Sequence, residues 1–352
     1  MKKSTKPNKS DELITQINEK FENLVNNLDS PQTDQEIKSY LKFAGQFHSY
    51  SMRNQMLIAI QADQRNMQLE HIASYKKWSD LKNDNGDKAN VQKGEKGFTI
   101  LVPIKYTQYE LDENRKYILD KNNKPIPKLD DNGNPIQGIA FKAGTVFDVN
   151  QTNAKEIGAY KTLNYRTITQ ADDTLLQKLK KEISQKFNIT VSEEPTNSQA
   201  KGYYSYEDNK IVISPIPTIS EKISTLYHEL GHHLIHGKQF KEGTLTYDNL
   251  HENRGAAEGE AEAFSYILSS MSNIENKSEL YIKTWGNDAN DLKDRFNLIT
   301  TTAKEAISQL NLENILTTHQ SDTQEEEPKE FTYTKGSLKD QLSQDKQITQ
   351  TQ

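Results

Sequence analysis

The chain has 352 residues, enough for two domains or one large one. Its composition is polar, with 33% hydrophobic and 27% charged residues. No apolar run is long enough to span a membrane and no apolar stretch follows the basic N-terminus, so we expect neither a membrane protein nor a secretory signal, but a cytoplasmic protein. The absence of cysteine excludes disulfides, thiolate zinc sites and cysteine nucleophiles, so any metal ligands must be His, Asp or Glu.

Charge is divided unevenly along the chain. Residues 1–167 contain 25 Lys and Arg against 21 Asp and Glu, a net charge of +4. Residues 168–352 contain 19 against 29, a net charge of −10. The mildly basic front half favours an anionic partner, and the acidic remainder indicates a different task.

A folded front domain is predicted over residues 11–160, after a polar stretch at 1–10 that we expect to be disordered. Apolar side chains recur at helical spacing over residues 11–62, which predicts two or three helices. Strands are predicted near 98–104 and 145–149. Between them, residues 107–138 are rich in Asn, Asp, Gly and Lys, which predicts a long exposed hairpin insertion.

Basic and aromatic residues alternate in three stretches of the front half, HSYSMRNQ, SYKKW and QKGEKGF. Lys and Arg neutralise phosphates while aromatic faces stack on unpaired bases, the usual combination for binding single strands. Alone this signal is weak, because Trp78 and Phe47 fit a hydrophobic core equally well. The candidate DNA contacts are Arg53, Asn54, Lys76, Lys77, Lys93 and Lys96.

Residues 161–172 are predicted to link the front domain to a second domain at 173–315, which opens with the amphipathic helix LLQKLKKEISQKF. The segment GYYSYEDNKIVISP alternates polar and apolar residues around a turn and predicts a hairpin. Such a strand offers an edge to which a substrate peptide can add. Four residues are candidate oxyanion stabilisers, although each fits an ordinary strand or loop position as well: Tyr203, Tyr204, Tyr206 and His251.

Residues 221–236, EKISTLYHELGHHLIH, predict an amphipathic helix whose first two histidines lie opposite its apolar face. His228, Glu229 and His232 form H-E-x-x-H, in which two imidazoles one turn apart hold Zn²⁺ and the glutamate serves as general acid/base. The alternative is a surface helix with merely polar histidines. His236 lies about 12 Å along the helix from His228, too far to share one ion. It is predicted either to be solvated or to contact a metal ligand without binding the metal itself.

Residues 256–268, AAEGEAEAFSYIL, predict a second helix with Glu258 and Glu262 four apart on one side. Catalytic zinc usually has three protein ligands, so we assign Glu258 as the third ligand and Glu262 as acceptor for the free N–H of a ligating histidine. The reverse assignment and a plain acid-rich helix start stay open. Glu260 projects elsewhere and is predicted to be solvated.

The run from the hairpin through YHELGH to EGEAEAFSY, over roughly residues 170–312, resembles zincin-like metallopeptidases of the ImmA/IrrE type and the peptidase half of ArdC-type antirestriction proteins. The following YIKTWGNDANDL, with Trp285, and a last helix near 290–311 extend the likeness. The strings YSMRNQMLIAIQ, KGEKGF and VFDVNQT resemble the ArdC-type domain that binds single-stranded DNA, although the 107–138 insertion departs from its compact pattern.

The resemblance implies an α+β fold in which an N-terminal single-stranded-DNA-binding domain precedes a zincin-like metallopeptidase domain. It implies that His228, His232 and Glu258 hold the zinc and that Glu229 is the catalytic acid/base. It further implies a mobile-element protein that protects incoming single-stranded DNA against restriction, with an unidentified peptide or protein substrate. Residues 316–352 are expected to form a disordered tail.

Two alternatives stay open at this point. One is a DNA-coating protein whose zinc site is structural or silent, and the other is a peptidase that cleaves a repressor in the manner of the ImmA/IrrE group. Duplex DNA is a further candidate ligand, and no membrane partner is expected.

Overall fold

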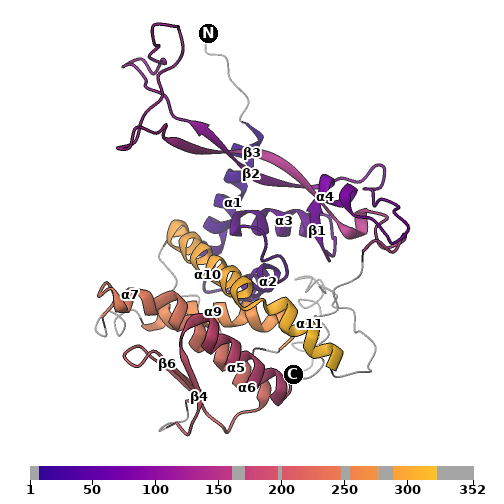
Figure 1. Ribbon diagram of the computed structural model, residues 1–352, viewed down its shortest axis with the longest axis vertical. Helices are drawn as coiled ribbons and strands as arrows, with labels where there is room; N and C mark the ends of the chain where they lie inside the picture. Colours follow the sequence, from indigo (N-terminus) through magenta and orange to yellow (C-terminus); the bar gives the residue numbers. More distant parts are fainter. Residues whose placement is uncertain are drawn as a thin grey trace, which may run out of the picture.

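The computed structural model describes residues 8–160, 171–196, 200–246, 254–274, 276 and 288–322. It combines helices with two small sheets, which confirms the α+β class. The front half occupies one end of the molecule and the second half the other, with α2 (Pro31–Gln46) and α10 (Ala289–Leu310) where they meet (Figure 1). Within the described part of the chain, no helix has the length and apolar character needed to cross a membrane.

Three helices open the front half, as the helical spacing predicted: α1 (Lys9–Asn26), α2 and α3 (Met52–Gln64). α2 begins where it does because the Ser30 hydroxyl accepts a hydrogen bond from the Gln32 N–H and Pro31 has no N–H to leave unpaired. α1 starts at Lys9, inside the stretch expected to be disordered, and residues 1–7 lie outside the described part.

An antiparallel sheet follows, with strand order β1-β3-β2. Its members are β1 (Ile72–Ser74), β2 (Phe98–Thr107) and β3 (Gln137–Asp148), so both predicted strands are confirmed and the second begins earlier than expected. A short helix α4 (Tyr75–Asp80) follows β1, and a 3₁₀ turn η1 (Val149–Gln151) follows β3.

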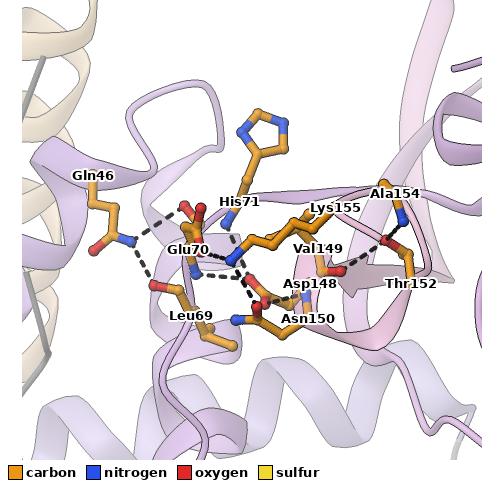
Figure 2. Close-up of polar contacts among 10 residues, drawn as sticks. All are labelled: Gln46, Leu69, Glu70, His71, Asp148, Val149, Asn150, Thr152, Ala154 and Lys155. Atoms are coloured by element: carbon orange, nitrogen blue, oxygen red, sulfur yellow. Dashed lines mark hydrogen bonds and ion pairs between the residues drawn. The ribbon is translucent and has the colours of Figure 1, made fainter. Parts of the chain in front are cut away.

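Asp148 ties the end of β3 to the chain that precedes β1 (Figure 2). Its carboxylate is fully buried and accepts hydrogen bonds from the N–H groups of Glu70 (2.8 Å), His71 (3.1 Å) and Asn150 (2.9 Å). Burial raises the pKa of Asp148, against the effect of these bonds. Asp148 of the VFDVNQT string therefore closes the sheet and has no access to a ligand.

The outer edge of β2 is closed by two amide side chains of α3. Asn54 donates to the Leu101 carbonyl (2.9 Å) and accepts from the Leu101 N–H (2.8 Å), and Gln61 makes the same two bonds with Thr99, both of 2.8 Å. The next residue facing this edge is Pro103, which has no N–H. Close to the body, β2 is therefore protected against pairing with another strand.

β2 and β3 reach away from the body as a two-stranded ribbon (Figure 1), and residues 108–136 form its tip. The tip contains the same turn three times. In each turn an Asp carboxylate accepts hydrogen bonds from the N–H groups two and four residues later, and the residue between these two has a positive φ. The aspartates are Asp112, Asp120 and Asp130, and the positive-φ residues are Arg115, Asn123 and Gly133. Between the turns, backbone hydrogen bonds form two closed cycles, in each of which every residue donates its N–H to the carbonyl of another. The first cycle consists of Glu110, Ile118 and Ile126, and the second of Gln108, Lys128 and Ile136. The insertion predicted as a hairpin is thus a three-leaved structure with its own hydrogen bonds.

The second half is built on a three-stranded sheet of order β4-β6-β5. α5 (Asp173–Phe187) leads into β4 (Thr190–Glu193), which pairs in parallel with β6 (Lys210–Ile213). β5 (Gly202–Ser205) pairs antiparallel with β6 and forms the sheet edge, so the predicted hairpin is confirmed.

Helices complete the second half. α6 (Ile219–Gly231) continues through a π-helical turn, η3 (His232–His236), into α7 (Gly237–Lys241). α9 (Arg254–Met271), α10 and α11 (Leu312–Asp322) follow, so the helices predicted from the second-half sequence are confirmed. α11 extends past residue 316, where the tail was expected to begin, and Trp285 lies outside the described residues.

One hydrophobic core contains residues of both halves. α2 packs on α9 and α1 packs on α10, where Phe21 and Phe296 meet edge to face with ring centroids 5.6 Å apart. Lys304 of α10 also donates to the Ser49 carbonyl at 2.9 Å. The predicted linker falls mostly on residues 161–170, outside the described part, and its extent stays a prediction.

Candidate metal centre

α6 begins with a capping box, in which the Thr218 hydroxyl accepts from the Glu221 N–H and the Glu221 carboxylate accepts from the Thr218 N–H. The helix fully buries its apolar face, which consists of Ile223, Leu226, Tyr227 and Leu230. His228 and His232 lie on the other side of the helix, where they line a cleft. The local sequence thus sets both the start of the helix and the direction of its histidines.

α9 approaches α6 closely because small residues meet at the crossing. A Cβ atom on Gly231 would lie 3.1 Å from the Ala261 Cα atom and 3.2 Å from its carbonyl oxygen. Glu258 precedes Ala261 by one helical turn and Glu262 follows it directly. The close contact therefore carries both carboxylates to the histidines of α6.

Three ligand atoms converge between the two helices. His228 Nε2 lies 3.3 Å from Glu258 Oε2, His232 Nε2 lies 3.6 Å from the same oxygen, and the two Nε2 atoms are 3.1 Å apart. Tetrahedral zinc with bonds of about 2.0–2.1 Å separates neighbouring ligand atoms by about 3.3 Å. His228, His232 and Glu258, which we call the donor triangle, therefore fit a metal ion as they stand.

The electrostatics of the donor triangle also favour a cation. Burial acts to lower the pKa of His228, but hydrogen bonds to Glu258 and Glu262 and the charge of Glu229 raise it to about 10. Hydrogen bonds to His228 and His232 hold the pKa of Glu258 well below its usual range, and burial lowers the pKa of His232 to about 4. Without a metal ion, a proton on His228 balances the carboxylates, and this proton must leave when a metal binds.

Glu262 supports His228 from behind, with its Oε2 atom 3.0 Å from His228 Nδ1. An N–H on Nδ1 leaves the Nε2 lone pair directed at the donor triangle. This is the arrangement that the sequence predicted for Glu258 and Glu262.

Glu229 is buried beside the donor triangle, at the floor of the cleft. Burial raises its pKa to about 7, while the charge of His228 and a hydrogen bond from the Tyr204 backbone N–H act to lower it. Tyr204 belongs to the edge strand β5, so Glu229 lies between that strand and the donor triangle. The cleft is further lined by Gly202, Tyr203 and Arg254.

Two known protein families match different parts of the chain. Residues 7–147 match the N-terminal domain of the anti-restriction factor ArdC, and residues 184–308 match the IrrE N-terminal-like domain, a peptidase family. The chain has the ArdC-type architecture.

Two solved structures of the antirestriction protein ArdC from plasmid R388 are similar to the chain. The metal-free structure is 20% identical with a TM-score of 0.43, covering 76% of this chain and 85% of that one. The Mn(II)-bound structure is 18% identical with a TM-score of 0.41, covering 75% and 84%. A search of curated proteins finds no match.

Two buried polar residues of this ArdC-type chain, Glu260 and His236, lie near the donor triangle, and the sequence misled for the first. The prediction that Glu260 is solvated is wrong, since it is only 6% exposed and bonded to His236 and Arg295. The physical reason is that α9 is enclosed by α6 on one side and by α10 on another, so a residue off its apolar face still meets protein. His236 lies outside the donor triangle, as its distance along the helix predicted. It is buried, and its Nδ1 atom lies 3.3 Å from His232 Nδ1, so of the two alternatives the structure favours the one in which it supports a ligand.

The candidate oxyanion stabilisers differ in their environments. Tyr203, Tyr204 and Tyr206 all line the cleft, but Tyr204 alone is buried. The Tyr204 hydroxyl contacts His233 Nδ1 (3.0 Å) and donates to Asn209 (3.1 Å), and burial raises its pKa to about 12. His251 lies outside the described residues.

The candidate DNA contacts of the front half are mostly exposed. These exposed candidates are Arg53, Lys76, Lys77, Lys93 and Lys96, and the Arg53 guanidinium lies 5.8 Å from the centre of the Phe141 ring. Asn54 is buried with both amide atoms bonded to Leu101, so it is withdrawn as a DNA contact. Trp78 and Phe47 are buried, which favours the core interpretation for both.

Proposed function

We propose that this ArdC-type chain is a zinc-dependent metallopeptidase whose front half binds single-stranded DNA, and that it protects incoming DNA against restriction. The observation that carries the proposal is the donor triangle with a buried carboxylate, Glu229, beside it in an open cleft. A structural zinc site has four protein ligands, whereas this set of three leaves a position for a reactant.

His228, His232 and Glu258 would hold the ion. When bound, zinc supplies Lewis acidity that activates water and polarises a peptide carbonyl. Glu229 would accept a proton from the attacking water and pass it to the leaving amine, and burial, which raises its pKa in the metal-free protein, makes it a stronger base than an exposed glutamate. The Tyr204 N–H favours the ionised form of its carboxylate.

A peptide substrate fits the cleft in an extended form. The Tyr204 N–H points away from β6 toward Glu229, so the backbone of Gly202, two residues earlier, faces the same side. Because the Tyr204 N–H is bonded to Glu229, a peptide lying along β5 would pair with the other backbone groups on this side and would pass close to Glu229 and the donor triangle. Arg254 at the rim favours substrates with acidic or carbonyl groups nearby.

Single-stranded DNA binding is proposed for the exposed cations Arg53, Lys76, Lys77, Lys93 and Lys96. Phosphate contacts release counterions, so the logarithm of the affinity for an oligonucleotide should fall with the logarithm of salt concentration, by about 0.7 per phosphate neutralised. Replacing all five by alanine should flatten this slope. An unchanged slope would place the binding surface elsewhere.

The zinc assignment is tested by elemental analysis of protein purified without chelator. Wild-type protein should carry one zinc, and Glu258→Ala should lose it. A wild-type protein without zinc, or a Glu258→Ala variant that keeps it, would refute the metal site.

The peptidase assignment is tested with Glu229→Gln, with Glu305→Gln as a control that makes the same change on an exposed face of α10. Glu229→Gln should retain zinc and DNA binding while losing protection against restriction, whereas Glu305→Gln should retain all three. Full protection by Glu229→Gln would remove the peptidase step and favour a DNA-coating role. A repressor held uncleaved by Glu229→Gln would favour the ImmA/IrrE-like alternative.

A further inference from the structure

A chain of hydrogen bonds leads from the metal ligand His232 into the protein. His232 Nδ1 lies 3.3 Å from His236 Nδ1, and His236 Nε2 lies 2.8 Å from Glu260 Oε2. Arg295 of α10 pairs with the other carboxylate oxygen of Glu260. His232, His236 and Glu260 are all less than 9% exposed, so this chain of contacts is enclosed by protein.

The donor and acceptor properties of these groups determine where the protons lie. A guanidinium only donates and an ionised carboxylate only accepts, so Glu260 accepts from Arg295 and from an N–H on His236 Nε2. A neutral imidazole that carries its hydrogen on Nε2 has a lone pair on Nδ1. The contact between the two Nδ1 atoms then needs the hydrogen on His232, which leaves the His232 Nε2 lone pair directed at the donor triangle.

We propose that His236, Glu260 and Arg295 are positioning residues that set the tautomer and orientation of His232 as a metal ligand. This role rests on the proposed zinc site. Glu262 does the corresponding task for His228 through a single contact, whereas His232 is reached through His236.

The π-helical turn η3 supports this role, because it begins at His232 and ends at His236. It places the two rings with centroids 5.4 Å apart and their Nδ1 atoms in contact. Single π-helical turns within α-helices often mark functional sites, since they redirect side chains at a cost in regular hydrogen bonding. Here the redirected side chain is the one that links the ligand to Glu260.

A purely structural role for the same residues makes a different prediction. If Glu260 and Arg295 served only to hold α9 to α10, their loss would lower the free energy of unfolding without changing the zinc affinity of the folded protein. A positioning role instead predicts that zinc affinity is high only when the side chain at position 236 can accept a hydrogen bond from His232 and donate one to Glu260 at the same time.

The test uses the full chain and measures Zn²⁺ affinity by competition with a chromophoric chelator and the absorption spectrum of bound Co²⁺. His236→Phe and Glu260→Gln should each weaken zinc binding about 10–100-fold and alter the cobalt spectrum. His236→Gln, whose amide both accepts and donates, should restore most of the affinity lost in His236→Phe. Adding Glu260→Gln to His236→Phe should cause no further loss, because Glu260 acts through His236.

Glu193→Gln is the matched control. It removes the ion pairs of Glu193 with Lys180 of α5 and with Lys222 in the first turn of α6, six residues before His228 and outside the donor triangle, so it should lower stability and leave zinc affinity unchanged. Nitrogen-15 NMR of the metal-free wild-type protein gives a reading that needs no variant, with hydrogen expected on Nδ1 of His232 and on Nε2 of His236.

The opposite tautomer in either ring, or wild-type affinity in His236→Phe, would overturn the positioning role. Equal losses in His236→Gln and His236→Phe would also count against it. If wild-type protein binds neither Zn²⁺ nor Co²⁺, the proposed function itself fails, and the two failures are thereby distinguished.

Discussion

Replacement of Asn54 by alanine separates the structural interpretation of the front half from the sequence-based one. The sequence placed Asn54 among the DNA contacts, next to Arg53, whereas the structure buries it against β2. We expect Asn54→Ala to lower stability strongly and to leave the DNA affinity of the folded protein unchanged. Arg53→Ala should instead weaken DNA binding and leave stability unchanged, because the Arg53 side chain is exposed.

The size of the effect follows from the two bonds that Asn54 makes with Leu101, at 2.9 and 2.8 Å. Truncation leaves the Leu101 N–H and carbonyl without partners next to a side chain that is 2% exposed. Each unpaired buried group costs about 1–3 kcal/mol, so the two together cost about 2–6 kcal/mol. The lower part of this range is expected, since the space left by the amide is lined by polar atoms that a water molecule can satisfy.

Urea denaturation followed by circular dichroism measures this loss, and fluorescence anisotropy with a labelled oligonucleotide measures DNA binding. Gln61→Ala is the matched comparison, because Gln61 makes the same pair of bonds with Thr99 at a partly exposed position. Its loss should be smaller than that of Asn54→Ala. The reasoning is refuted if Asn54→Ala is as stable as wild type, or if it weakens DNA binding while remaining folded.

Three further predictions concern the second half and the ribbon tip. The pKa of Glu229 is about 7 in the folded metal-free protein, so its protonated form stabilises the fold below its ordinary pKa and this stabilisation is lost as the pH rises through 7. Between pH 4.5 and 7, the free energy of unfolding of the metal-free protein should therefore fall more steeply for wild type than for Glu229→Gln. Gly202→Ala places a Cβ atom 2.6 Å from Thr225 Cγ2 and 2.7 Å from the Val212 carbonyl, and should cost about 1–3 kcal/mol in urea denaturation by pushing β5 away from α6. Replacing residues 108–136 by Asn-Gly joins the paired residues Thr107 and Gln137 by a two-residue turn. Because the backbone hydrogen bonds of the tip are made within it, the melting temperature and the zinc affinity should stay unchanged. A fall in either would contradict this.

The donor triangle could be predicted from sequence because each helix supplies its residues at local spacing. His228 and His232 are four residues apart, as are Glu258 and Glu262, and helical geometry alone places each pair on one face. The partners of Glu260 and Asn54 could not be predicted in this way. Arg295 is 35 residues from Glu260 and Leu101 is 47 residues from Asn54, so only the packing of distant elements decides that these polar groups are buried.

α10 belongs to the metal centre and to the front half at once. Its Arg295 pairs with Glu260 behind the donor triangle, and the next residue, Phe296, packs on Phe21 of α1. Neighbouring residues of a helix point about 100° apart, so one turn of α10 contacts both parts of the protein on different sides. Because the same hydrophobic core also joins α2 to α9, the two matched families, at 7–147 and 184–308, are separate units of sequence that share one core.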